Sequence, residues 1–334
     1  METRIEIKKI PWISGFDYLR VFFIICVIYM HLHKFPPNEN NSLLQYFFYY
    51  ALCCTATPGF LLISLYIQGI KKNTNQSHYF GLANYVYLYL FWVGCWCLLT
   101  KSYPEPSIRG VFLHLLQGGG WSFYFFAALI YTHLVRIYVA SWNDKSLWCG
   151  LLLSMIIALT IFCGLFMDNR FLQTNETYWW PVNFMPAPFI SSLLERNSEV
   201  IQSNTKIATK ICLVILLTAV LVMLLEMKLV QNISGNYTYL AIPEYLRASP
   251  WLFATCVVIY AHRFNYSNKI VGFFARNTLG IFCLHVFVLD GLATIMNKLI
   301  SIEVYATLAT LCITIVGCAL AAELIRKVLR SRVI

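Results

Sequence analysis

The sequence predicts an all-α fold, a polytopic bundle of about ten transmembrane helices. Hydrophobic residues make up 59% of the 334-residue chain and charged residues only 12%, and the mean hydropathy is +0.64. A soluble domain is about 25% charged, so this chain cannot cover a globule of its size with polar surface. The composition excludes disorder, an ordinary soluble enzyme and a disulfide-stapled secreted domain. It favours a membrane protein whose apolar surface is covered by the lipid bilayer.

Nine segments are predominantly apolar over roughly the 20 residues that a helix needs to cross a bilayer. In chain order they are 14–35, 44–69, 80–100, 112–134, 147–167, 207–227, 249–262, 272–292 and 304–325. The first run is too long for a cleavable signal peptide and lacks a small-residue cleavage site, so we expect it to remain as the first span. The run 249–262 is the shortest of the nine.

A tenth candidate span, 178–194, begins with three aromatic residues, contains three prolines and ends in an apolar run. Lys and Arg residues gather in cytoplasmic loops. With nine spans and a cytoplasmic N-terminus, the basic C-terminal segment 326–332 would lie outside, whereas a tenth crossing brings it inside with most other basic residues. We therefore predict ten spans and two cytoplasmic termini. A re-entrant or interfacial 178–194 is the alternative, because proline breaks a lipid-facing helix.

The whole chain, residues 1–334, is predicted to form a single integral-membrane domain. No linker, low-complexity tract or repeat of fixed period divides it. The net charge of +10 is typical of basic cytoplasmic loops, and no basic stripe with interleaved aromatic residues points to a nucleic-acid partner. The 12 cysteines lie in or beside apolar runs, which favours reduced thiols. No set of His, Cys, Asp or Glu has metal-ligand spacing, so we expect no metal.

Asp17, Arg20 and His31 stand out because they lie in the first predicted span. Ionisable groups inside a membrane are costly and are functional candidates by default. Arg20 and His31 are eleven residues apart, so they share one helical face at about 16 Å along the axis, and Asp17 lies beside Arg20. A histidine near the outer end can take a proton from a hydroxyl, and an arginine near the inner end can bind phosphate. The alternative is that both side chains only snorkel to the nearest interface.

Four stretches, in this order, resemble the integral-membrane acyltransferase family 3. The first is the Arg-x10-His signature formed by Arg20 and His31. The second is the apolar run 58–64, the third is the aromatic start of a middle span at 121–129, and the fourth is the segment 277–285, which resembles a late Thr-x-Gly-Ile-Tyr-Leu-x-His pattern. Members of this family O-acetylate sugars of cell-surface glycans, and the resemblance spans most of the chain.

The resemblance implies an O-acetyltransferase of the bacterial inner membrane. Acetyl-CoA in the cytoplasm would be the donor, and the acceptor would be a surface polysaccharide such as O-antigen or its undecaprenyl-linked precursor. His31 would act as the general base, Arg20 would position the donor and Asp17 would orient Arg20. A covalent acyl intermediate on His31 is the alternative mechanism.

Three features depart from the family pattern. In the run 58–64, no glycine follows Ser64 where the pattern ends in Ser-Gly. The start of the third predicted span, 78–90, has no Arg or Lys where family members have an Arg-rich segment, and Phe282 stands where tyrosine is common. Besides Arg20, we therefore expect the donor phosphates to contact other cations on the predicted cytoplasmic side. These candidates are Lys71, Lys72, Arg136 and Arg276.

His285 lies inside a late span, and we interpret it as a hydrogen-bonded core histidine rather than a catalytic one. Assigning it the late catalytic role used by the other large superfamily of membrane-bound O-acyltransferases conflicts with the first-span motif. A different class of function is a transporter, flippase or polymerase of lipid-linked sugars, in which buried Arg and His would line a solute path. That class predicts internal repeats, and the sequence has none. The sequence carries no signal for an oligomeric state.

Overall fold

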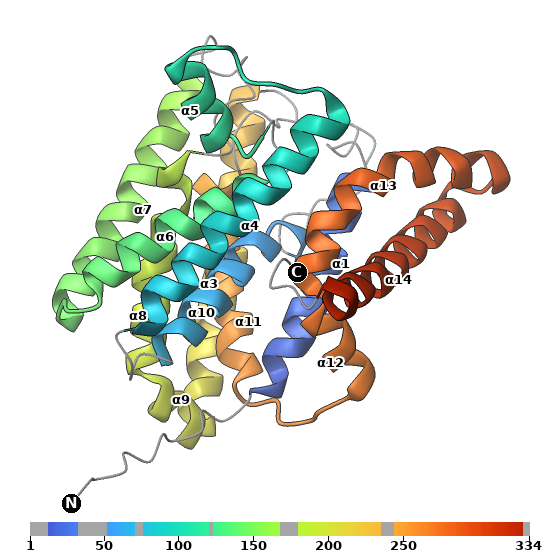
Figure 1. Cartoon of the computed structure of the whole chain (residues 1–334). Helices are drawn as coiled ribbons and strands as arrows, with labels where there is room; N and C mark the ends of the chain where they lie inside the picture. The colour runs from blue at the N-terminus through green and yellow to red at the C-terminus, as the bar shows by residue number, and fades with distance from the viewer. Residues whose placement is uncertain are drawn as a thin grey trace, which may run out of the picture.

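A computed structural model describes residues 13–32, 52–70, 76–119, 123–167, 180–234 and 244–329, and the long regular elements among them are all helices (Figure 1). The first half contains α1 (Ser14–Leu32), α3 (Ala56–Ile70), α4 (Gln76–Thr100), α5 (Ile108–Leu116), α6 (Tyr124–Val139) and α7 (Asp144–Met167). The second half contains η3 (Pro181–Phe184), α8 (Pro186–Arg196), α9 (Ser198–Ser203), α10 (Thr205–Ser234), η4 (Glu244–Leu246), α11 (Ala248–Ala261), α12 (Lys269–Arg276), α13 (Thr278–Leu299) and α14 (Glu303–Leu329).

Six of the described helices are long and apolar enough to cross a membrane, namely α1, α4, α7, α10, α13 and α14. Three further apolar helices, α3, α6 and α11, are shorter. The long helices expose many leucines, such as Leu217 and Leu324, and a lipid bilayer would cover this surface. The prediction of a helical membrane bundle is therefore confirmed, whereas the described helices do not add up to about ten long spans.

The structure divides the predicted span 112–134 between α5 and α6. Gly118 and Gly119 adopt φ angles of 72° and 71°, in the left-handed region that favours glycine and ends helices. A Cβ atom on Gly118 would lie 2.0 Å from the backbone nitrogen of Tyr124, so the turn also depends on the missing side chain. The predicted span 272–292 is divided in a similar way, because α13 begins only at Thr278, after the short helix α12.

The segment 178–194 does not form a long helix where the structure describes it. It contains η3 and then α8, whose 11 residues are too few to cross a bilayer. Pro186 and Pro188 lie in the first turn of α8, where a missing N–H removes no intrahelical bond. α8 is buried against α3, α6 and α7. This arrangement agrees with the re-entrant alternative rather than with a tenth crossing.

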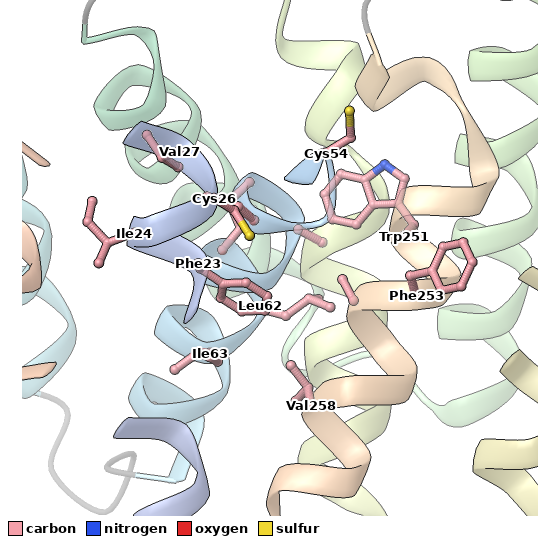
Figure 2. Packing of buried hydrophobic residues seen from close by; sticks show 14 of the residues in the cluster. Phe23, Ile24, Cys26, Val27, Cys54, Leu62, Ile63, Trp251, Phe253 and Val258 are labelled. Carbon is pink, nitrogen blue, oxygen red and sulfur yellow. The ribbon is translucent and has the colours of Figure 1, made fainter. Parts of the chain in front are cut away.

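The core lies between α1, α3 and α11 (Figure 2). Phe23 of α1, Leu62 of α3 and Trp251 of α11 are almost completely buried there. Gly59 lets α3 approach α1, since a Cβ atom on it would lie 2.2 Å from the ring of Phe23. Small residues allow this kind of close helix packing inside a membrane. α1 is thereby held firmly by its neighbours.

Two ends of the bundle are named for the description that follows. The start of α1, the end of α11 and the helix α12 lie together at the end drawn lowest in Figure 1, which we call the inner end because the charge pattern predicts it to be cytoplasmic. The outer end is the opposite one, where α1 ends and α5 lies. α1 also contacts α13 and α14, so it is one of the helices that join the two halves of the chain.

Candidate functional site

α1 carries the three ionisable residues that the sequence singles out. Asp17 and Arg20 lie one turn apart at the inner end, with 3.6 Å between the Arg20 Nη1 and Asp17 Oδ1 atoms. This spacing of three residues places the two side chains on neighbouring positions of one face. His31 lies in the last turn of the helix at the outer end. α1 therefore joins an ion pair at one end of the bundle to an imidazole at the other.

A cavity of about 850 Å³ lies beside the ion pair, and we call it the inner cavity. Its charged lining residues are Asp17, Arg20, Lys269 and Arg276. The rest of the lining is mainly apolar and aromatic, and three hydroxyl groups belong to Ser64, Tyr85 and Thr278. The volume lies within the range of pockets that hold small molecules. Three cations against one carboxylate make the inner cavity suited to an anionic ligand.

The rim of the inner cavity carries further positive charge. Arg276 ends α12, and its half-exposed guanidinium lies 3.6 Å from a carboxylate oxygen of Glu323 on α14. Glu323 also pairs with Arg326 and Lys327. The single carboxylate of Glu323 thus pairs with three cations, so the net charge beside the cavity is positive. Anions approaching from this side are attracted by that positive charge.

Two residues of the inner cavity were missed by the analysis of the sequence. Lys269 is the first residue of α12, where Asn268 caps the helix by accepting a hydrogen bond from the backbone nitrogen of Ile270 at 2.8 Å. Tyr85 of α4 accepts a hydrogen bond from the amide of Gln68 at 2.8 Å. Lys269 could have been found from the basic residues Arg263, Lys269 and Arg276, which precede the late apolar run. Tyr85 carried no signal, because it is one of many aromatic residues in α4.

The cations predicted to bind the acetyl donor do not all lie in the same place. Arg20 and Arg276 line the inner cavity, and Lys71 and Lys72 lie outside the described residues. Arg136 does not line it. This side chain is buried between α6 and α8, where its guanidinium pairs with a carboxylate and donates a hydrogen bond of 3.1 Å to the hydroxyl of Ser191.

The carboxylate that pairs with Arg136 belongs to Glu195. Two guanidinium nitrogens of Arg136, Nε and Nη2, are thereby engaged within the protein. Gly69 of α3 completes the site, because a Cβ atom there would lie 2.1 Å from a guanidinium nitrogen of Arg136. The expectation that Arg136 binds the donor stays a prediction. In the structure this side chain lies outside the lining of the inner cavity and joins α6 to α8.

The structure brings His31 and His285 together across the contact of α1 with α13. Their ring centroids are 5.2 Å apart, with 51° between the ring planes, and we call them the histidine pair. His285 is completely buried, and its Nδ1 atom lies 2.6 Å from the carbonyl oxygen of Phe282. A carbonyl only accepts, so Nδ1 carries the proton and Nε2 of the neutral ring does not. The interpretation of His285 as a buried, hydrogen-bonded side chain agrees with this, but its contact with His31 was not anticipated.

Three phenylalanine rings, which we call the aromatic wall, line the inner cavity close to the histidine pair. The rings belong to Phe60, Phe125 and Phe282. The Phe125 ring centroid lies 6.1 Å from that of Phe60 and 5.3 Å from that of Phe282. The ring of Phe282 also lies 5.8 Å from that of His285. The aromatic wall therefore contacts both the inner cavity and, through Phe282, the histidine pair.

The chemistry available at this site is proton transfer and anion binding. Its polar groups are an imidazole pair, three cations, one carboxylate and hydroxyl groups. Across the described segments, no group of three or more His, Cys, Asp or Glu side chains could hold a metal ion. An imidazole beside a second imidazole can serve as a general base.

A family model described as an acyltransferase domain matches residues 13–323 of the chain. No curated protein and no solved structure matches it. The matched region begins just before α1 and ends within α14 at Glu323. It therefore contains both the inner cavity and the histidine pair.

Proposed function

The chain belongs to the membrane acyltransferase family whose model matches residues 13–323, and we propose that it moves an acetyl group from acetyl-CoA to a hydroxyl of a cell-surface polysaccharide. The inner cavity is the observation that best supports this proposal, because its three cations lie on α1, which also contains His31, or on the neighbouring helix α12. The acceptor is O-antigen or its undecaprenyl-linked precursor, and it approaches from the outer end. The protein lies in the bacterial inner membrane with both termini in the cytoplasm.

The donor enters the inner cavity from the cytoplasm. Its phosphate groups bind among Arg20, Lys269 and Arg276, since guanidinium and ammonium groups are the usual partners of phosphate. Asp17 holds the guanidinium of Arg20 in place. The arm that ends in the thioester lies along the apolar lining and points toward the aromatic wall. Closure against water by these rings protects the thioester from hydrolysis.

The transfer needs one base. A ring nitrogen of His31 takes the proton of the acceptor hydroxyl while the oxygen attacks the thioester carbonyl carbon. The carbon–oxygen bond forms, the carbon–sulfur bond breaks, and the proton passes from His31 to the leaving sulfur. His31 is then neutral again, and acetylated glycan and CoA are the products. In the alternative scheme the acetyl group first bonds to His31 and moves to the hydroxyl in a second step.

Membership of an acyltransferase family favours this reaction over the transporter, flippase or polymerase alternative. The two classes differ in what they consume. An acyltransferase releases one free thiol from the donor for each modified acceptor, whereas a transporter moves the glycan without using a thioester.

Glycan mass tests the acceptor. The chain is expressed in a bacterial host with a surface glycan of known repeat mass, next to His31→Ala at the same protein level. We expect the wild type to add one acetyl group per repeat and His31→Ala to add none. If the glycan stays unmodified although the wild-type protein is fully expressed, the proposed acceptor is wrong. If His31→Ala still acetylates the glycan, the proposed role of His31 is wrong.

A second experiment tests the donor. Purified protein is incubated with acetyl-CoA or with acetyl-pantetheine, which carries the same thioester without phosphates, and thiol release is followed in the presence of the acceptor glycan. We expect acetyl-pantetheine to need a much higher concentration, because it lacks the groups that bind Arg20, Lys269 and Arg276. Equal use of both compounds would refute phosphate binding by the inner cavity.

A further inference from the structure

His285 has one ring nitrogen engaged and one available. Nδ1 donates to the carbonyl oxygen of Phe282 one turn earlier in α13, and this bond fixes both the ring orientation and the tautomer. Nε2 is left with a lone pair and, among the described residues, has no hydrogen-bond partner. The side chain is completely buried. A buried acceptor without a partner destabilises the fold, so a nearby donor is expected to satisfy it.

His31 is the group in position to be that donor. Its ring is tilted against the ring of His285 with a centroid separation of 5.2 Å, close enough for a rotation of the His31 ring to bring an N–H onto Nε2. The other ring that packs on His285 in the described residues is that of Phe282, which offers no N–H. His31 lies in the last turn of α1 and is exposed at the outer end, whereas His285 is completely buried.

We propose that His285 is the positioning residue of His31: its Nε2 atom accepts a hydrogen bond from one ring N–H of His31 and thereby holds the other nitrogen unprotonated and facing the acceptor hydroxyl. The inference rests on the proposed role of His31 as the base. The hydroxyl proton moves to the free nitrogen of His31 and then to the donor sulfur. His285 takes no proton in either step. It stabilises the positive charge that His31 carries between the two steps.

Two substitutions separate this role from simple packing. The amide of His285→Gln reaches the place of Nε2, and its oxygen can accept the bond from His31. The shorter amide of His285→Asn reaches the place of Nδ1, so it can keep the bond to the Phe282 carbonyl but offers no acceptor to His31. Thermal unfolding of both variants, compared with the wild type, shows whether the bundle is folded.

Kinetics give the first readout. We expect His285→Asn to lower kcat by at least about tenfold, because a base held in the wrong tautomer cannot take the hydroxyl proton. KM for acetyl-CoA should not change, because His285 does not line the inner cavity. His285→Gln should keep most of the wild-type kcat. Equal losses of kcat in the two folded variants, or a rise in KM alone, would overturn the proposal.

The nitrogen-15 NMR spectrum of histidine-labelled protein gives the second readout and does not depend on activity. The His31 signals are assigned from their absence in His31→Ala. We expect one tautomer of His31 in the wild type and in His285→Gln, and a mixture in His285→Asn. A single unchanged tautomer in His285→Asn would overturn the proposal. If these spectra behave as expected but the wild type transfers no acetyl group, the proposed function fails and the positioning contact stands.

Discussion

Arg20→Lys is the perturbation that tests the inner cavity most directly. It keeps the positive charge beside Asp17 but removes the planar fork of the guanidinium. The side chain of Arg20 is only 24% exposed, so solvent screens its contacts weakly. A charge-assisted hydrogen bond in such a place contributes about 1.5–3 kcal/mol. We therefore expect the Kd for acetyl-CoA to rise about 10- to 100-fold.

Arg276→Ala provides the comparison within the same cavity. This side chain is 56% exposed and is shared with Glu323, which already attracts two other cations. Exposed ion pairs contribute little and are screened by salt, so we expect the Kd to rise by no more than about fivefold. That smaller effect should shrink further at high ionic strength. We expect the larger rise in Kd for Arg20→Lys because the side chain of Arg20 is less exposed than that of Arg276.

Equilibrium binding of acetyl-CoA to purified protein, at low and high salt, measures both values. Arg196→Lys is the matched control, because Arg196 pairs with Asp144 away from the inner cavity and its replacement makes the same chemical change. We expect its Kd to equal that of the wild type. The reasoning is refuted if folded Arg20→Lys binds the donor normally, or if Arg276→Ala weakens binding as much as Arg20→Lys does.

Three further predictions concern the bundle. Arg136→Ala should lower the free energy of unfolding by about 3–5 kcal/mol, because it leaves a partly buried carboxylate unpaired. The folded fraction should bind acetyl-CoA with the wild-type Kd. A higher Kd would show that Arg136 does contact the donor. Gly59→Ala should lower the midpoint of thermal unfolding, since the added methyl group meets a phenylalanine ring of α1; an unchanged midpoint would contradict the packing. Reporter fusions after Lys145 and Arg263 should both report the cytoplasm. A signal from outside the cell in either fusion would contradict the assignment of the inner end to the cytoplasm.

Part of the site could be predicted because it lies within one helix. Asp17 and Arg20 differ by one turn, and His31 follows on the same face, so the helical repeat alone sets their relations. The all-helical class was equally accessible, because composition decides whether lipid must cover the surface. Neither inference needs any knowledge of how distant segments meet.

Other features depend on contacts between distant segments. Arg136 and Glu195 are 59 residues apart, and nothing near Arg136 in the chain indicates a buried partner. The contact of His31 with His285 joins α1 to α13 and needs the packing of the whole bundle. The end of α5 could not be predicted from hydropathy. The backbone turns at Gly118, whereas the sequence stays apolar on both sides of that residue. An apolar run measures burial in lipid or protein, and it does not report where a helix stops.

The same turn of α13 serves both parts of the site. Phe282 lines the inner cavity with its ring, and its carbonyl oxygen accepts the hydrogen bond that orients His285. A donor that displaces this ring to reach His31 therefore acts on the turn that holds the neighbouring imidazole. We therefore expect binding in the inner cavity and the placement of the base to be coupled through Phe282, because binding energy can be used to assemble a catalytic geometry. A donor that lacks the phosphates should then lose kcat as well as affinity, because it supplies less binding energy for the displacement of this ring.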